Sequence, residues 1–336
     1  MRRFFLRLIL LVVLFLACTA VYNRWAFLHY RSACPPPGKV YAVDGFGMHL
    51  FCTGSGSPAV ILESGLGDDA RIWGAVQPEL SKLTRVCSYD RAGLGWSDPR
   101  PDLRDSNSIA DQLHHLLRAA GISGPIVLMG HSIAGLHMRA YFSKYPDGII
   151  GVVFVDAATP ADIPRALEGE ERLIRQLFWI KPLMTLGFGR LAGKCGSNPP
   201  PGMEAYARWY RADNYCNPGY AAVWVHEVEG FEASAGEVMH TGPFVDLPTL
   251  IFSRDPELVS SKSSTAASAQ DTRNWCDSQE GLKKLSSRSR RIIARRSTHY
   301  IQIDRADLLN REVSLFIGQI RGDSAQPVDY GSTQTR

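Results

Sequence analysis

The sequence has few of the features on which metal, nucleic-acid or repeat functions depend. It contains no Cys-x-x-Cys pair and no His/Cys spacing typical of a metal site. The formal net charge is only +4, and no basic patch is interleaved with aromatic residues, so nucleic acid is not an expected partner. Internal repeats are also absent. We therefore expect no metal and no cofactor.

Long apolar runs are scarce too, and the one present lies in residues 1–33. Three arginines precede the run Leu8–Tyr22, whose length falls between a signal-peptide core and a membrane span of about 20 residues. Basic residues before the run favour a cytoplasmic start and an exported remainder. The segment is then either an uncleaved membrane anchor or a signal peptide cleaved near Cys18–Ala20. The aromatic Trp25 beyond the run favours the anchor. A buried helix is a third interpretation. Export predicts either a membrane-anchored catalytic domain outside the cytoplasm or a periplasmic or secreted one.

Six of the seven cysteines lie beyond this segment. An even number in an exported protein permits disulfides. Cys195 and Cys216 flank a proline-rich loop and are the pair we expect. Cys52 and Cys87 lie in predicted strands, where a buried thiol is the commoner outcome.

The remaining chain alternates predicted strands with predicted helices. Its 45% apolar and 21% charged residues are ordinary for a globular protein. Such alternation predicts an α/β fold with a mostly parallel sheet of about eight strands, covered by helices on both faces. The expected strands are Lys39–Asp44, Met48–Thr53, Ala59–Glu63, Arg85–Asp90, a run from Pro125, Gly151–Asp156, Leu247–Ser253 and Arg291–Ala294. The expected helices of the sheet domain include Ser106–Ala120, Ala266–Ser286 and Asp307–Ile320.

One region breaks this alternation and sets the domain boundaries. Residues 161–242 contain helical segments, many aromatic side chains and a proline-rich loop, which predicts a helical lid inserted into the sheet domain. The sheet domain then consists of residues 34–160 and 243–321. A polar tail, residues 322–336, is expected to be disordered.

A serine stands at the predicted turn between a strand and a helix. The run Pro125–Met129 is apolar and branched, as in a strand buried on both faces. It leads through Gly130 and His131 to Ser132, and such a serine among small residues is typical of a nucleophile elbow. The last position of the usual Gly-x-Ser-x-Gly pattern is Ala134, so we expect a slightly wider but intact elbow.

Further motifs accompany the elbow in a fixed order. They are Ser64–Gly67 after the third strand, Tyr89–Asp98 after the fourth, Ser253–Pro256 after the seventh and Ser297–Gln302 after the eighth. With these motifs the chain resembles an α/β-hydrolase of the serine-nucleophile branch over nearly all of residues 39–320. The resemblance implies the α/β-hydrolase fold and a catalytic triad in the order Ser, Asp, His.

Chemistry and the resemblance together assign roles to these residues. The Ser132 hydroxyl is a poor nucleophile at neutral pH and needs a base to take its proton. His299 is the candidate, because imidazole titrates near neutrality and can return the proton to the leaving group. Asp255, just past a strand end, is expected to orient the imidazole, with Asp156 after the sixth strand as the backup acid. His131 is expected to be a packing residue.

The tetrahedral intermediate of acyl transfer carries an oxyanion that needs backbone donors. The resemblance implies the N–H groups of Leu66 and Ile133. Ser64 stands where the family commonly has histidine, so the contacts that anchor this loop must differ. Glu63 is expected to pair with a basic group such as Arg91.

The expected function is hydrolysis of carboxylic esters through an acyl-enzyme, on a small-molecule acyl substrate. A serine nucleophile speaks against the epoxide hydrolase and haloalkane dehalogenase branches, which use aspartate. One alternative is an aminopeptidase or amidase of the proline-iminopeptidase type, in which Glu168, Glu171 or Asp213 would hold the substrate amine. Another is a non-catalytic binding protein on a hydrolase scaffold, although all three triad candidates are present. The sequence carries no indication of the acyl chain length or the oligomeric state.

Overall fold

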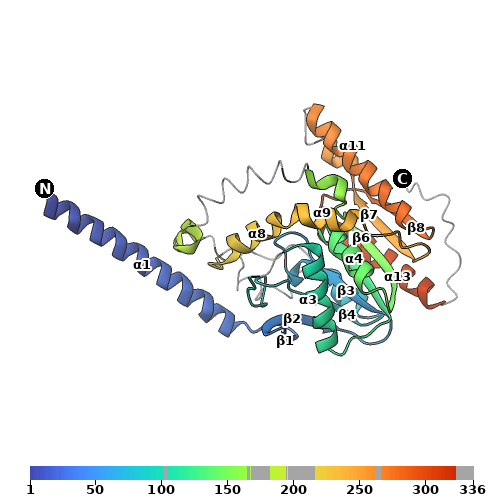
Figure 1. The fold of residues 1–336 in the computed structure, drawn as a ribbon, viewed down its shortest axis with the longest axis horizontal. Helices are drawn as coiled ribbons and strands as arrows, with labels where there is room; N and C mark the ends of the chain where they lie inside the picture. Colours follow the sequence, from blue (N-terminus) through green and yellow to red (C-terminus); the bar gives the residue numbers. More distant parts are fainter. Residues whose placement is uncertain are drawn as a thin grey trace.

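An eight-stranded sheet forms the centre of the molecule (Figure 1). The structure is a computed structural model that describes residues 1–101, 104–164, 167, 182–193, 195, 216–261 and 266–322. The strands lie in the order β1-β2-β4-β3-β5-β6-β7-β8. Their bounds are β1 (Lys39–Val43), β2 (Phe46–Thr53), β3 (Ala59–Glu63), β4 (Val86–Tyr89), β5 (Ile126–His131), β6 (Ile149–Val155), β7 (Thr249–Arg254) and β8 (Ser289–Ala294). Strand β2 runs antiparallel to both neighbours, and the other pairs are parallel.

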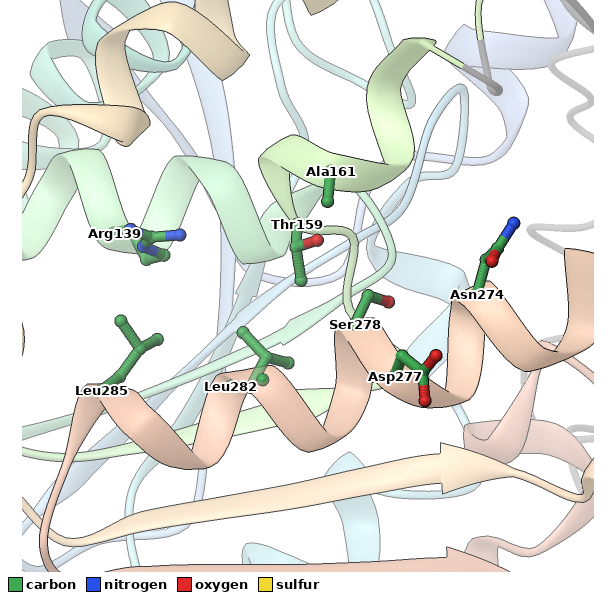
Figure 2. A pocket seen from close by; sticks show the side chains of 9 residues that line it. Arg139, Thr159, Ala161, Asn274, Asp277, Ser278, Leu282 and Leu285 are labelled. Carbon is green, nitrogen blue, oxygen red and sulfur yellow. The ribbon is translucent and has the colours of Figure 1, made fainter.

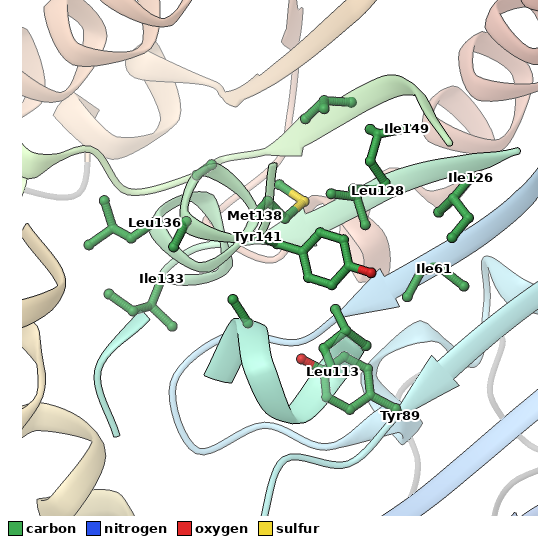
Figure 3. Packing of buried hydrophobic residues seen from close by; sticks show 14 of the residues in the cluster. Ile61, Tyr89, Leu113, Ile126, Leu128, Ile133, Leu136, Met138, Tyr141 and Ile149 are labelled. Atoms are coloured by element: carbon green, nitrogen blue, oxygen red, sulfur yellow. The ribbon is translucent and has the colours of Figure 1, made fainter. Parts of the chain in front are cut away.

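Helices cover both faces of this sheet, as the alternating pattern predicts. The side chains of a strand point alternately to opposite faces, so Ile61 of β3 joins one buried cluster while Val60 and Leu62 join the other. The first cluster packs on α3 (Ser106–Ala119), α4 (Ala134–Lys144) and α9 (Phe231–Met239). Figure 3 shows Ile61 and Leu128 of the sheet facing side chains of α3 and α4. The second cluster packs on α2 (Gln77–Leu80), α12 (Ile301–Asp304) and α13 (Ala306–Arg321). The predicted fold class is confirmed.

Local sequence accounts for the ends of these helices. The Asp105 carboxylate accepts a hydrogen bond from the Ser108 N–H at 2.7 Å and caps the start of α3. The apolar residues Ile109, Leu113 and Leu116 then follow at helical spacing and are buried. Helix α13 ends at Gly322, whose φ of +74° is a conformation that favours glycine.

Several helices occupy the chain between β6 and β7. Among the described residues of the predicted lid, and just before it, these are η2 (Pro160–Asp162), α6 (Phe188–Leu191), α8 (Tyr220–Glu229) and α9. After β7 come α10 (Pro256–Ser261), α11 (Ala266–Gly281) and η4 (Leu282–Leu285). Residues 323–336 of the predicted tail lie outside the described residues. Before the sheet, α1 (Arg2–Ala33) is a single helix whose first half projects away from the body (Figure 1).

Two disulfides link parts of the chain that are distant in sequence. Cys195 and Cys216 are paired, as expected. Cys52 and Cys87 are also paired, so the expectation of two buried thiols is wrong. They lie directly opposite each other on the antiparallel strands β2 and β4, with Cα atoms 4.0 Å apart. Strand register brings the two sulfur atoms together, and register cannot be derived from the spacing of cysteines.

We predict that the double variant Cys52→Ala/Cys87→Ala lowers the free energy of unfolding by about 2–4 kcal/mol, because a bridge closing a long loop restricts the unfolded chain. Urea denaturation without reductant measures the change. The matched control is Cys276→Ala, which removes a free thiol and should alter the value by no more than about 0.5 kcal/mol. Equal stability of the double variant and the control would contradict the prediction.

Candidate active site

Ser132 occupies a tight turn between β5 and α4. Its φ is +57°, in the left-handed region that non-glycine residues rarely adopt. The turn is held on both sides, because the Ser132 N–H donates to the Val155 carbonyl at 3.2 Å and the Ser132 carbonyl accepts from the Ala158 N–H at 2.7 Å. A Cβ at Gly130 would lie 2.8 Å from the Ala134 methyl, so glycine is required where strand and helix meet.

A chain of two hydrogen bonds links Ser132 to a carboxylate through His299. The Ser132 Oγ lies 2.9 Å from His299 Nε2, and His299 Nδ1 lies 2.6 Å from Asp156 Oδ2. The carboxylate can only accept, so Nδ1 carries a proton and Nε2 is left to accept the serine proton. The three residues come from the ends of β5 and β6 and from the loop after β8. The sequence predicts that Ser132 and His299 lie together, and the structure places their side chains within hydrogen-bond distance.

Asp156 is fully buried and held by three donors. Its Oδ1 accepts the Arg254 N–H and the Trp275 indole N–H, each at 2.9 Å, while Oδ2 accepts from His299. Burial opposes ionisation, yet the hydrogen bond and charge of His299, together with Arg254, bring the pKa of Asp156 below its usual value. The Arg254 guanidinium also stacks over the Trp275 ring at 4.3 Å. The carboxylate is therefore fixed in position and ionised at neutral pH.

Asp255 has different partners from those we expected. Its carboxylate accepts the N–H groups of Arg296 at 2.8 Å and Glu257 at 3.0 Å, and it lies 3.4 Å from the Arg295 guanidinium. These bonds hold the turn before α10 to the loop after β8, and the first-choice prediction of an Asp255–His299 contact is corrected to Asp156. Strands β6 and β7 are parallel neighbours, so both acids lie at the same edge of the sheet. Asp255 is occupied by one backbone donor of its own turn, Glu257, and by one from the loop after β8, Arg296.

His131 supports the loop that carries His299. Its Nε2 donates to the His299 carbonyl oxygen at 3.0 Å, and the two rings lie 4.5 Å apart. Burial, with a further contribution from the charge of His299, lowers the pKa of His131 to about 3. His131 is therefore neutral at physiological pH. It contributes a fixed donor, which is more than the packing role expected of it.

The loop after β3 is tied down by Arg91, in place of the contacts that a histidine at position 64 would make. The Arg91 guanidinium donates to the carbonyls of Ser64 and Gly65 at 2.5 and 2.6 Å. Across the described residues, the N–H groups of Leu66 and Ile133 donate to no protein acceptor. Both amides are therefore available to a substrate oxygen.

Arg91 is itself paired with a residue that the sequence analysis missed. Glu227 of α8 accepts from Arg91 Nε at 2.7 Å and from the Gly67 N–H at 2.8 Å. Both charged side chains are almost fully buried. Glu63 contacts His137 at 2.6 Å and Arg91 only at 3.9 Å, so its closest partner differs from the one expected. No local pattern marks Glu227, which is 136 residues from Arg91 along the chain.

Asp68 follows this loop and carries less negative charge than its residue type indicates. Burial and the neighbouring Asp69 raise the pKa of Asp68 to about 7, although Arg91 opposes the shift. A substantial fraction of Asp68 is therefore protonated at neutral pH.

A pocket of about 380 Å³ lies between α4, η2, α11 and η4 (Figure 2). Its lining residues are Arg139, Thr159, Ala161, Asn274, Asp277, Ser278, Gly281, Leu282 and Leu285. The Arg139 guanidinium donates to the Val238 carbonyl and the Thr241 hydroxyl at 3.0 and 3.1 Å. None of the residues that contact the Ser132 hydroxyl lines this pocket.

Within the ranges described above, no cluster of three or more His, Cys, Asp or Glu side chains could hold a metal ion.

Comparisons with known proteins agree with the fold described above. A family model described as alpha/beta hydrolase fold matches residues 58–179. The uncharacterized protein YbdG of Bacillus subtilis is 29% identical over 198 residues, covering 58% of this chain and 60% of that protein. The chain spans 60% or less of the length of the three curated relatives that it matches first.

Solved structures share the fold at low sequence identity. A thermophilic esterase from Thermogutta terrifontis has a TM-score of 0.55 at 20% identity, covering 84% of this chain and 98% of that one. A putative ancestral haloalkane dehalogenase has a TM-score of 0.61 at 17% identity, with 84% and 99% covered. Residues 58–179 thus match the α/β-hydrolase family model, and the solved structures share the fold of the chain. Its structural neighbours include enzymes of different chemistry, so the reaction must be argued from the site itself.

We predict that Asp156→Asn slows labelling of Ser132 by a fluorophosphonate probe by about a thousandfold or more, because an amide at this position favours the wrong imidazole tautomer. Asp255→Asn should slow labelling by no more than about threefold, since it loses only loop contacts. The measurement is the second-order labelling rate, read by mass spectrometry of the Ser132 peptide. If Asp255→Asn slows labelling more than Asp156→Asn does, Asp255 is the acid that orients His299.

Proposed function

We propose that this protein is a serine hydrolase that cleaves carboxylic esters through an acyl-enzyme. The observation that carries the proposal is the linked pair of hydrogen bonds from Ser132 through His299 to Asp156. A hydroxyl placed at an elbow, with a base at 2.9 Å and a buried carboxylate behind that base, is suited to nucleophilic attack on a carbonyl carbon. A serine at this position accounts for acyl transfer rather than the aspartate-based chemistry of dehalogenases.

The steps follow from the atoms in place. Ser132 Oγ attacks the ester carbonyl as His299 Nε2 takes its proton, and Asp156 stabilises the imidazolium that forms. The N–H groups of Ile133 and Leu66 donate to the developing oxyanion. The intermediate collapses as His299 returns the proton to the departing alcohol. Water, activated by His299, then attacks the acyl-enzyme and releases the acid.

The Arg91–Glu227 pair positions the second oxyanion donor. Arg91 fixes the carbonyls of Ser64 and Gly65, and Glu227 fixes the N–H of Gly67, so the peptide between them presents the Leu66 N–H in one orientation. A donor held in advance stabilises the transition state without reorganising during the reaction. Glu227 thus acts through the loop as a positioning residue.

The proline-iminopeptidase alternative depends on side chains that would bind a substrate amine. Glu168, Glu171 and Asp213 all lie outside the described residues. The location is proposed to be extracytoplasmic, since both disulfides are consistent with an oxidising compartment and α1 is long and apolar enough to cross a membrane.

The primary test compares the full chain with Ser132→Ala on p-nitrophenyl esters of two and eight carbons and on aminoacyl-p-nitroanilides. We expect ester hydrolysis to exceed anilide hydrolysis, and Ser132→Ala to reduce it to the background rate, about a millionfold below the wild type. Fluorophosphonate labelling of the same samples reports whether the serine is activated. Faster anilide turnover would favour the peptidase, and a folded chain that neither labels nor turns over would favour a binding protein.

We predict that Glu227→Gln lowers kcat for a soluble ester by about 10- to 100-fold while KM changes little, because the loss falls on oxyanion stabilisation. The matched control is Glu229→Gln on the same helix, whose side chain is 62% exposed. That variant should retain wild-type kcat. Both are assayed below their melting temperatures, measured by circular dichroism. A rise in KM at unchanged kcat would contradict the positioning role.

A further inference from the structure

The second half of α1 packs against the body of the protein. Four of its residues are buried, namely Thr19, Asn23, Ala26 and Phe27. Their spacing of four, seven and eight residues places them on one face of the helix. Arg31 follows on the same face and donates to the Trp96 carbonyl at 2.9 Å, beside the loop that carries Arg91. The helix is therefore attached at several points along its last three turns.

Asn23 makes the most specific of these contacts. Its side-chain amide donates to the carbonyls of Met184 and, at 3.5 Å, Thr185, and its oxygen accepts from Arg190 Nε at 3.0 Å. Only 1% of Asn23 is exposed. Gly187 lies against the helix so closely that a Cβ there would be 2.7 Å from the Asn23 Cβ. A buried amide with this many matched partners indicates a built interface between α1 and residues 182–193.

The first half of α1 has the opposite character. Every residue from Met1 to Phe15 is exposed, and the apolar run Leu8–Tyr22 ends one residue before Asn23. A helix of 32 residues is about 48 Å long, whereas the hydrocarbon core of a bilayer is about 30 Å thick. Tyr22 and Trp25 are about half exposed at the point where the run ends, as side chains at a membrane boundary commonly are. The docked half of α1 begins at Thr19, in the last turn of the apolar run, beside the point where the helix would leave the bilayer.

This geometry points to a membrane-contacting surface formed by Thr19–Arg31 of α1 together with the docked residues 182–193, which we call the platform. We infer that α1 is retained as part of the folded protein and that the platform rests on a phospholipid bilayer. Leu183 and Leu191 of the platform are 48% and 52% exposed, and both lie in the segment that Asn23 holds beside the end of the apolar run.

Charge and continuity favour a lipid bilayer over a protein as the occupant. The two segments of the platform contain three arginines and no Asp or Glu, which suits anionic headgroups. The platform also continues the helix that would span the membrane, so any bilayer that holds α1 is already beside it. Exposed leucines then contact the acyl boundary, while the exposed Arg24 contacts the headgroups.

The platform is connected to the oxyanion loop. The Thr185 hydroxyl donates to the Pro218 carbonyl at 3.4 Å, and the Cys195–Cys216 disulfide joins the end of the platform to the chain just before α8. Helix α8 carries Glu227, which holds the N–H of Gly67. If the proposed esterase function holds, on which this last step rests, the substrate is an ester dissolved in the lipid phase.

Contact with lipid is tested on the full chain in vesicles of phosphatidylcholine with phosphatidylglycerol. A bimane label is attached at Leu183→Cys, or at Val245→Cys as control, with Cys18, Cys34 and Cys276 replaced by alanine. Val245 is 69% exposed and precedes β7, at the sheet edge opposite the candidate site. Doxyl-labelled lipids should quench the label at 183 at least about twofold more than at 245. Equal quenching, or an intact mass showing that α1 has been removed from the membrane-bound chain, would overturn the inference.

The substrate class is tested with Leu183→Glu/Leu191→Glu on 4-methylumbelliferyl oleate in vesicles and on soluble p-nitrophenyl acetate. We expect about a tenfold loss on the vesicle substrate and less than about a twofold loss on the soluble one. Val245→Glu is the control and should match the wild type on both. If the variant loses equal activity on the vesicle substrate and on the soluble one, the inference that the substrate enters from the bilayer is overturned. A wild type inactive on both would refute the proposed function alone, because the quenching result does not depend on activity.

Discussion

The hydrogen bond between His299 and Asp156 depends on the arrangement of the whole sheet. Asp156 follows β6 and His299 follows β8. Strand β7 lies between these two strands and supplies the Arg254 N–H to the same carboxylate. The parallel strands place their carboxyl ends along one edge, where loops distant in sequence meet. Trp275 of α11 then closes the carboxylate from solvent. Any change in the register of these strands would move the acid away from the base.

A second buried network extends from the sheet into the inserted helices. Arg91 follows β4 and Glu227 lies in α8, yet the pair controls the loop after β3. A buried ion pair contributes little net stability once its desolvation is counted, so its value lies in geometry. Here it fixes three peptide groups beside the candidate nucleophile. Helix α8 is therefore part of the candidate site.

Much of this architecture could be predicted from the sequence, for identifiable physical reasons. Apolar runs and their turn residues mark the strands, and the small residues around Ser132 mark the elbow because only a tight turn requires them. The choice between Asp156 and Asp255 could not be made, because each of them follows one of two neighbouring strands. It depends on which hydrogen-bond donors each carboxylate meets in the folded protein. The Cys52–Cys87 bridge depends on strand register, and Glu227 on how a helix 136 residues away from Arg91 packs. Such contacts leave no local pattern.

The left-handed backbone at Ser132 has a counterpart at Asp156, whose φ is +45°. Of the five described non-glycine residues with positive φ, these two are neighbours in the candidate site, and Arg296 lies in the loop just before His299. Each such residue costs about 1–3 kcal/mol in conformational strain, which the surrounding packing must offset. Three of these five positions thus lie where the nucleophile, its acid and the loop of its base meet. This protein gives up part of its folding free energy to keep three side chains in line before any substrate arrives.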